Sequence, residues 1–262
     1  SPEKNLTWQL AFIEHEQVKM IPQPPGSFWA DPFPLHNENT HWVFFEELDD
    51  EGKGVISVFE TDGTIIENKK IVLDQEFHMS FPYVFEREGN FYMIPEQSAS
   101  GRLDIYVSDN FPHSWSHYKT LISDIKALDA VWVKHNGKYW LFFNKIEEFE
   151  HDNNERLYIY YADDLFSDKW LPHKKNPVII DISKARNAGK IFNHKGEIFR
   201  PAQNCKRSYG SEIVINKILK LTETEYEEAT VWGLNHYNNH FGMHTYNRAG
   251  DLVVTDFLVK KS

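Results

Sequence analysis

Cysteine is almost absent from this sequence, because Cys205 is the only one among 262 residues. A single thiol excludes an internal disulfide, and a lone cysteine is more often a small buried apolar residue than a nucleophile. No stretch approaches 18 apolar residues, so nothing in the sequence predicts a membrane-spanning helix. No signal-peptide pattern is present, and the compartment stays open. Because the chain opens on Ser1 rather than Met, a soluble product exported after removal of a preceding segment is one expectation.

An excess of basic charge is also missing. The chain has 28 Lys and Arg against 39 Asp and Glu, a formal net charge of -11. Without a basic patch, we expect neither a nucleic acid nor an anionic membrane surface as a partner. Aromatic residues are abundant instead, with 8 Trp, 12 Tyr and 19 Phe. They predict a large core and many strands, and they supply rings of the kind that stack on sugars.

A 16-residue pattern recurs four times along the chain. The copies start at residues 31, 81, 129 and 188, at spacings of 50, 48 and 59. They read DPFPLHNENTHWVFFE, FPYVFEREGNFYMIPE, DAVWVKHNGKYWLFFN and AGKIFNHKGEIFRPAQ. Each is an apolar strand, a polar turn and an apolar-aromatic strand, and a period near 50 of this kind is typical of propeller blades. The sequence predicts one all-β domain over residues 1–262, a five-bladed β-propeller of mostly antiparallel, four-stranded blades around a central channel.

Further β-rich runs bounded by Gly, Asp, Asn or Pro predict outer strands. They lie at residues 55–59, 103–107, 157–161, 212–215 and 252–257. Segments 111–115 and 165–170 follow two of these runs and are expected to belong to the outer strands of successive blades. The fifth blade is expected to combine 212–218 with 240–257, closed by a strand at 8–13 that hides the last sheet edge. The one expected helix is 222–228, where a Thr and a Glu three residues later form a capping box.

The first position of the repeat holds candidate catalytic residues. It is occupied by Asp31, Phe81, Asp129 and Ala188. Aspartate is a poor strand former and unhelpful in a core, so two of them at matched positions call for a reason. Cleavage of a glycosidic bond needs two carboxyl groups, one to donate a proton and one to activate water or attack. The alternative is that each Asp accepts hydrogen bonds from amides at the strand start.

The last position of the repeat is always polar, with Glu46, Glu96, Asn144 and Gln203. Glu96 is a candidate carboxyl group, and the other interpretation is a polar belt at the channel mouth. Glu46 stands beside a second glutamate, which favours a solvent-facing side chain.

Other residues are candidates for contacts with a sugar. Arg186, just before the fourth copy, could clamp a carboxylate or phosphate, hold a catalytic Asp ionised, or form a structural ion pair, and its neighbour Asn187 is a candidate for substrate binding. The remaining candidates for substrate binding are Trp29, His78, Trp132, Gln203, Tyr209, His240 and His244.

His236, His240 and His244 recur every four residues. On a helix this spacing would put them on one face, as in some zinc sites. The Asn and Gly residues between them favour a loop or strand, so we predict contacts with sugar hydroxyls or a plain surface rather than a metal site. No cofactor is expected, and a metal ion in the channel is the less favoured alternative.

Two resemblances follow from these residues. The Asp-Pro start, the five-blade period and the second Asp in the third copy resemble five-bladed propeller glycosidases such as arabinanases, β-xylosidases and invertases. A closer resemblance covers nearly the whole chain. The segments SFPYVFEREGNFYMIPEQS, LDAVWVKHNGKYWLFFN, HKKNP, ARNAGKIFNHKGEIFRPAQNC, YG and LTETEY resemble the N-terminal domain of plant glucosamine inositolphosphorylceramide transferases. In those proteins a separate C-terminal domain carries the transferase chemistry, so the resemblance implies a carbohydrate-linked propeller.

The glycosidase resemblance implies roles for particular residues. Asp31 would be the base or nucleophile, and Asp129 would tune the acid and orient the sugar. Those enzymes usually place their acid Glu at the start of the fourth blade, where this chain has Arg186, Asn187 and Ala188. Glu96 from the second blade is our candidate for the missing acid.

Three functions remain open at this point. The first is a glycoside hydrolase with Asp31 and Glu96 as its carboxyl pair, which requires a separation of roughly 5 to 9.5 Å. The second is a glycan-binding or accessory propeller, in which exposed rings such as Trp29 and Trp132 hold a carbohydrate or glycoconjugate. The third is a structural or protein-interaction propeller whose channel is blocked by side chains.

Overall fold

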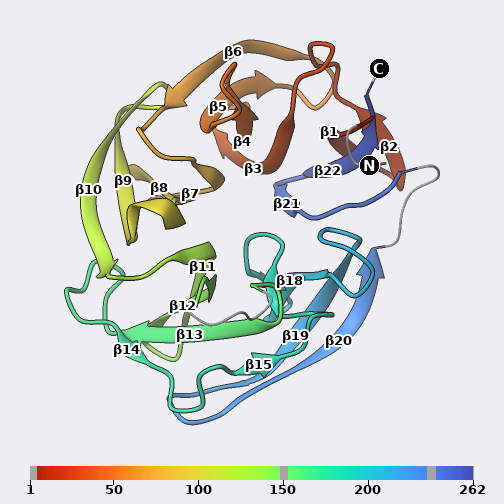
Figure 1. The fold of residues 1–262 in the computed structure, drawn as a ribbon. Coiled ribbons are helices and arrows are strands. Elements are labelled where there is room, and N and C mark those ends of the chain that lie inside the picture. Colours follow the sequence, from red (N-terminus) through yellow and green to blue (C-terminus); the bar gives the residue numbers. More distant parts are fainter. Residues whose placement is uncertain (1–4, 148–152, 235–239, 262) are drawn as a thin grey trace. The chain divides into compact units, whose positions relative to one another are not determined.

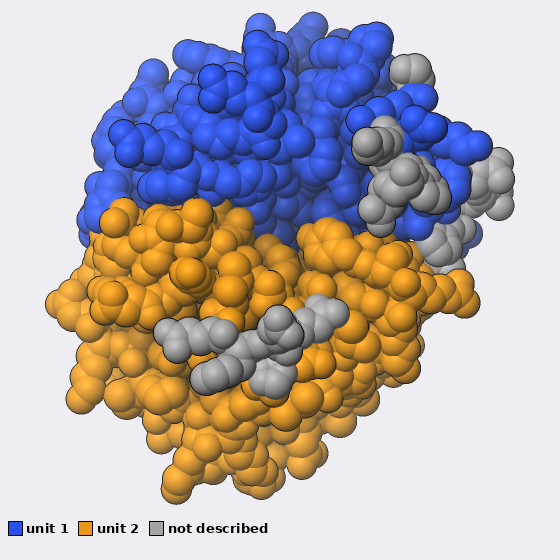
Figure 2. Space-filling model, viewed as in Figure 1, with its two compact units in different colours: residues 1–95, 105–118, 236–262 blue, residues 96–104, 119–235 orange. Residues whose placement is uncertain are grey.

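The computed structural model describes residues 5–147, 153–234 and 240–261. Its contacts group the chain into two compact units (Figure 2). Unit 1 comprises residues 1–95, 105–118 and 236–262, and unit 2 comprises residues 96–104 and 119–235. That residues 1–262 form a single domain stays a prediction.

Two four-stranded antiparallel sheets lie in unit 1 (Figure 1). One has the order β3-β4-β5-β6, with β3 (Trp29–Asn37), β4 (Thr40–Leu48), β5 (Gly54–Thr61) and β6 (Ile66–Leu73). The other has the order β2-β1-β22-β21, with β1 (Leu6–Glu14), β2 (Gln17–Met20), β21 (Tyr246–Ala249) and β22 (Leu252–Lys260).

A third sheet has the order β10-β9-β8-β7. Its strands are β7 (Ser80–Arg87), β8 (Asn90–Glu96), β9 (Arg102–Asn110) and β10 (Ser114–Ser123). Between β8 and β9 lies a single-turn 3-10 helix, η2 (Ser98–Ser100).

Two sheets lie in unit 2. The first contains β11 (Ala127–His135), β12 (Lys138–Lys145), β13 (Arg156–Ala162) and β14 (Leu171–Pro172) in that order, and β15 (Ile179–Ile180) also pairs with β13. The second has the order β16-β18-β19-β20, with β17 pairing with β18. Its strands are β16 (Arg186–Asn187), β17 (Phe192–His194), β18 (Glu197–Asn204), β19 (Glu212–Leu221) and β20 (Tyr226–Leu234).

These five antiparallel sheets confirm the predicted fold class, an all-β, five-bladed β-propeller. Each of the four repeats is a hairpin, and the turn explains its recurring glycine. Gly89, Gly137 and Gly196 have φ of 78°, 76° and 80°, and Asn39 takes the same place in the first repeat with φ of 73°. Glycine and asparagine adopt this left-handed conformation more readily than other residues do.

The strand that closes the fifth sheet is also confirmed. Strand β1 pairs with β22 in a register that runs from Leu6 opposite Lys260 to Ile13 opposite Val253. The pairing joins the two ends of the described chain and covers what would otherwise be an open sheet edge. Segment 212–218 was wrongly assigned to this blade, because β19 pairs with β18 and β20 in the fourth sheet.

The predicted helix at 222–228 is wrong. These residues form the β19–β20 turn and the start of β20. The Thr222 hydroxyl does accept a hydrogen bond from the Glu225 amide at 3.0 Å, as a helix N-cap would. The local signal was therefore real, but β-strand pairing on both sides of the turn decided the structure.

The core explains two further residues. Cys205 is buried, as expected for a lone cysteine. Trp29 is only 2% exposed and packs in the apolar cluster of unit 1 against Phe45 and Phe59. The expectation that Trp29 presents an exposed ring is wrong, since its indole fills the core. Among the described residues, the structure contains no helix of the length and apolarity needed to cross a membrane.

Candidate functional site

The first position of the repeat carries backbone strain in three of its four copies. Asp31, Phe81 and Asp129 have φ of 52°, 45° and 49°, the left-handed region that non-glycine residues rarely adopt. In β3 the pairing register shifts between Ala30 and Phe33, so Asp31 lies in a β-bulge. Bulges re-aim side chains and are common next to active sites. Strain of this kind costs about 1–3 kcal/mol per residue and clusters at functional sites.

The bulge places the Asp31 carboxylate among several donors of unit 1. Its Oδ1 accepts a hydrogen bond from the Thr245 hydroxyl at 2.8 Å, and its Oδ2 accepts one from the Phe81 amide at 3.2 Å. The Asp31 amide itself donates to Asp256 Oδ2 at 2.9 Å. The side chain is buried, so these contacts take the place of water.

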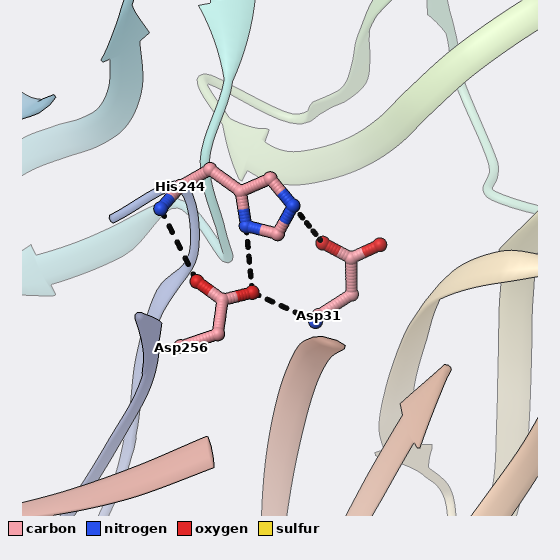
Figure 3. Close-up of side chains that lie close together, drawn as sticks. All are labelled: Asp31, His244 and Asp256. Carbon is pink, nitrogen blue, oxygen red and sulfur yellow. Dashed lines mark hydrogen bonds and ion pairs between the residues drawn. The ribbon is translucent and has the colours of Figure 1, made fainter. Parts of the chain in front are cut away.

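His244 lies between two carboxylates (Figure 3). Its Nδ1 is 2.6 Å from Asp256 Oδ2, and its Nε2 is 3.7 Å from Asp31 Oδ1. The short contact assigns a proton to Nδ1, which leaves Nε2 facing the Asp31 carboxyl group. Without a further proton, the Nε2 lone pair and the Asp31 carboxylate repel each other. A second proton, on Nε2 or on Asp31, makes their contact attractive. The row Asp256–His244–Asp31 therefore has a place for one further proton between His244 and Asp31, at a separation longer than a hydrogen bond.

The Trp8 indole covers His244. Their ring centroids are 3.8 Å apart and the ring planes differ by 8°. This stacking covers one face of the imidazole and fixes the plane of the ring.

Asp31, His244 and Asp256 are also the cluster of described residues that could hold a metal ion, since one ligand atom from each lies within 4.8 Å of the others. The donor set argues against an ion there. Asp256 already accepts hydrogen bonds from the amides of Asp31, His244 and Thr245 as well as from the His244 ring. A cation would have to replace several of these contacts, so the residues do not fit a resident metal.

A second histidine–carboxylate pair lies in unit 1. His78 Nε2 is 3.0 Å from Glu46 Oε1, and His78 Nδ1 accepts a hydrogen bond from the Gly54 amide at 2.9 Å. Glu46 is 6% exposed, so the expectation that it faces solvent is wrong. His78 is itself exposed, and it covers the buried carboxylate.

In unit 2, Asp129 forms a buried ion pair with Arg186, with Nε 2.5 Å from Oδ2. Arg186 also lies over the Tyr209 ring, 5.6 Å from its centroid, and Nη1 donates to Asn154 at 3.3 Å. Burial alone would lower the pKa of Arg186, but the Asp129 carboxylate raises it above its ordinary value. Arg186 therefore stays charged, and its guanidinium fixes the Asp129 side chain.

The remaining polar candidates of unit 2 are bound within the fold. Asn187 is fully buried, donates to the carbonyls of Asp129 and Phe142, and accepts from Arg200. Gln203 is 1% exposed and donates to the Asn187 carbonyl at 3.2 Å. These contacts fix the backbone beside Asp129, and a direct sugar contact from either residue stays a prediction.

Three further candidates are Glu96, Trp132 and Tyr209. Glu96 ends β8, is buried, and accepts a hydrogen bond from the Ser98 amide at 2.8 Å. Trp132 is partly exposed on β11 and packs against Tyr139, and Tyr209 is 44% exposed. A predicted pair of Asp31 with Glu96 combines residues of different units and stays a prediction.

The histidine spacing has no helical basis in the described residues. His240 precedes the last sheet and stacks on Phe257, with ring centroids 4.2 Å apart. His244 belongs to the row described above, and His236 lies outside the described residues. Sequence reasoning found His244 but missed Asp256, Thr245 and Trp8. The Asp256 signal was present, because an Asp inside the apolar run LVVTDF is as unusual as the one that drew attention to Asp31.

A separate cavity of about 520 Å³ lies in unit 2. It is lined by residues 122–126 and 145–147 together with Arg156 and Tyr160, and none of the predicted site residues contributes to it. Glu147 pairs with Lys145 and Arg156 there, so the basic groups are already partly neutralised.

Solved structures share the fold of this chain. The fold is similar to a thermostable family-43 glycoside hydrolase, with a TM-score of 0.63, 12% identity and coverage of 86% of each chain. It is equally similar to the Podospora anserina α-L-arabinofuranosidase PaAbf62A, with a TM-score of 0.62, 11% identity and coverage of 96% of each chain. At this low identity the likeness concerns the fold alone, a five-bladed propeller of the kind used by glycosidases.

The sequence shows the family. Residues 14–254 match the family described as "Glucosamine inositolphosphorylceramide transferase 1, N-terminal", and the chain belongs to it. Glucosamine inositolphosphorylceramide transferase 1 of Arabidopsis thaliana is 35% identical over 212 residues, which are 79% of this chain and 28% of that protein. The Oryza sativa subsp. japonica protein of the same name is 34% identical over the same shares. The chain thus spans less than a third of the curated relatives that it matches.

Proposed function

We propose that this chain acts on carbohydrate, as a glycoside hydrolase whose chemistry centres on Asp31. The row Asp256–His244–Asp31 is the observation that carries the proposal. It offers a carboxyl group in a strained bulge, a histidine able to share its proton, and a second carboxylate that orients the histidine. A carboxylate needed only for the fold would be satisfied by Thr245 and Phe81, without a histidine at 3.7 Å.

The choice of sugar follows from the relatives. Their name refers to glucosamine and inositolphosphorylceramide. We therefore propose a glycoconjugate that carries an amino sugar or a related hexose as the first ligand to test. In unit 2, Trp132 and Tyr209 are partly exposed rings, and their contact with a sugar is a separate proposal, since sugar faces pack on aromatic rings.

The test is a turnover screen on aryl arabinofuranosides, xylosides, galactosides and glucosaminides, together with bacterial and plant glycans. We expect turnover by the unmodified chain and, on the glycans, whose leaving oxygens need a proton, a loss of at least ~100-fold in Asp31→Asn, which keeps the size of the side chain. Asp163→Asn is the matched control, because the Asp163 side chain is 90% exposed. Undiminished turnover of the glycans in Asp31→Asn would overturn the role of this residue.

A second candidate function is a glycan-binding accessory propeller. Two observations in unit 2 favour it. Ala188 is fully buried and supplies no carboxyl group where the glycosidases usually place their acid, and Asp129 is neutralised by Arg186. Absence of turnover, with saturable glycan binding by both the unmodified chain and Asp31→Asn, would favour this function over hydrolysis.

A further inference from the structure

We propose that Glu46, held by His78, is the second reacting carboxyl group of the Asp31 site and its ionised member. The inference rests on the proposed hydrolase function and changes which carboxyl group donates the proton and which accepts it. Asp31 with His244 would then be the proton donor, whereas the resemblance to glycosidases assigned Asp31 as base or nucleophile. All of these residues belong to unit 1.

One short segment contacts both carboxylates. The Phe81 amide donates to Asp31 at 3.2 Å, and His78, three residues earlier, contacts Glu46 at 3.0 Å. Three residues span at most roughly 10 Å of chain. The strand pairing gives a second constraint, because Glu46 is directly opposite Ala30, the residue before Asp31. Both constraints put the two carboxylates on one strand pair and beside one segment, and attack by an activated water needs a separation of roughly 6.5 to 9.5 Å between them.

The backbone fixes the proton of His78. Because Nδ1 accepts the Gly54 amide hydrogen at 2.9 Å, the ring proton must be on Nε2, which donates to Glu46 at 3.0 Å. A second proton on Nδ1 would break the contact with Gly54. His78 is thus held as a neutral donor, and a hydrogen bond donated to a carboxylate stabilises its ionised form.

The two pairs are therefore complementary. Glu46 is held ready to accept a proton, and the row Asp256–His244–Asp31 is able to hold one. In the proposed step a water oxygen bonds to the anomeric carbon while Glu46 takes the water proton. The bond from that carbon to the leaving oxygen breaks, and Asp31 with His244 supplies the proton to this oxygen. One water is consumed, and proton transfer from Glu46 back to Asp31 through solvent restores the site.

The first experiment compares leaving groups. A dinitrophenyl glycoside needs little protonation of its leaving oxygen, whereas an alkyl glycoside needs a proton donor. We expect Asp31→Asn to lose at least ~100-fold on the alkyl substrate and less than ~10-fold on the dinitrophenyl substrate. Glu46→Gln should lose at least ~100-fold on both, and sodium azide should restore part of the turnover of Glu46→Ala on the dinitrophenyl substrate.

The second experiment tests His78 as a positioning residue. Gln at this place can donate to Glu46 and accept from Gly54, whereas Ala can do neither. We expect His78→Gln to retain turnover within ~5-fold and His78→Ala to lose at least ~20-fold in kcat with little change in KM. His194→Ala, an exposed histidine on β17, is the matched control. Thermal unfolding of every variant separates a lost site from a lost fold.

The outcomes distinguish this inference from the function on which it rests. Absence of turnover by the unmodified chain on every substrate would overturn both. Turnover that falls in Asp31→Asn but persists in a folded Glu46→Gln would overturn the inference and leave the proposed function standing. If Glu46→Gln loses turnover of the alkyl glycoside but keeps turnover of the dinitrophenyl glycoside, the assignment of Glu46 is also overturned.

Discussion

Trp8 lies flat on His244, with ring centroids 3.8 Å apart and ring planes 8° from parallel. The contact joins β1, near the start of the chain, to the segment just before β21, near its end. It depends on the pairing of β1 with β22, which also carries Asp256 opposite Leu10. The strand that closes the fifth sheet thus supplies both the ring that covers His244 and the backbone that faces its orienting carboxylate.

The first prediction concerns this stacking. Trp8→Leu keeps an apolar side chain but removes the ring, so we expect turnover to fall by about 10-fold, because the stacked pair that fixes the imidazole is worth about 0.5–1.5 kcal/mol. Trp8→Phe should retain most of it. Trp115→Leu, which alters another buried tryptophan of unit 1, is the control and should lower Tm without lowering turnover of the folded protein. Equal turnover in Trp8→Leu and Trp8→Phe would contradict the proposed role of the ring.

The second prediction concerns the Asp129–Arg186 pair of unit 2. Removing one member of a buried ion pair leaves an uncompensated charge, which typically lowers the free energy of unfolding by about 3–5 kcal/mol. We expect Arg186→Met to lower the free energy of unfolding by about this amount in urea titrations. The double variant Arg186→Met/Asp129→Leu should recover most of the loss, because no buried charge is left. If the loss in the double variant equals the sum of the losses in Arg186→Met and Asp129→Leu, the two side chains are not coupled.

The third prediction uses two strand glycines. A Cβ on Gly54 would lie 2.4 Å from the Met79 carbonyl oxygen and 2.7 Å from the His78 ring, closer than any real contact. A Cβ on Gly233 would have no neighbour nearer than 4.0 Å. We therefore expect Gly54→Ala to lower Tm by at least about 5 °C and Gly233→Ala to change it by less than about 2 °C. Similar Tm values for the two variants would contradict the close approach of His78.

The fourth prediction is a dependence of stability on pH. His173 is 2% exposed, and burial lowers its pKa below the ordinary value of 6.5. Below about pH 6.5 the unfolded chain therefore binds a proton that the folded chain does not, so the contribution of His173 destabilises the fold as the pH falls. The free energy of unfolding should drop between pH 7.5 and 5.5, by at most about 1.4 kcal/mol per pH unit from this group.

Urea titrations at the two pH values measure this effect. His173→Gln should reduce the difference between them, whereas His194→Gln, at an exposed position, should leave it unchanged. An undiminished difference in His173→Gln would assign the acid sensitivity to other groups.

The regular part of the fold could be predicted because its causes are local. Alternating apolar residues and left-handed turn positions recur in each copy, and Asn39 replaces glycine where the same turn is needed. The helix prediction failed where two local signals competed. The hydrogen bond from the Glu225 amide to Thr222 formed as predicted, but the residues on both sides of it pair as strands β19 and β20.

The candidate site was predicted in part. An unusual polar residue in an apolar strand pointed to Asp31, and the same reasoning applies to Asp256. Their meeting depends on contacts across 225 residues of chain, which no spacing in the sequence expresses. Glu46 was judged solvent-facing from its neighbour Glu47, although burial depends on the segment that carries His78.

The sequence by itself determined the repeat, the hairpins and the fold class, because strand alternation and turn conformation are properties of residues close together in the chain. Only the tertiary structure decided which polar residues meet. The bulge at Asp31 turns its carboxylate toward His244, and the pairing of β1 with β22 brings the two ends of the chain together. Both result from packing between distant segments, so the proton-holding row and the His78–Glu46 pair become visible only in the folded chain.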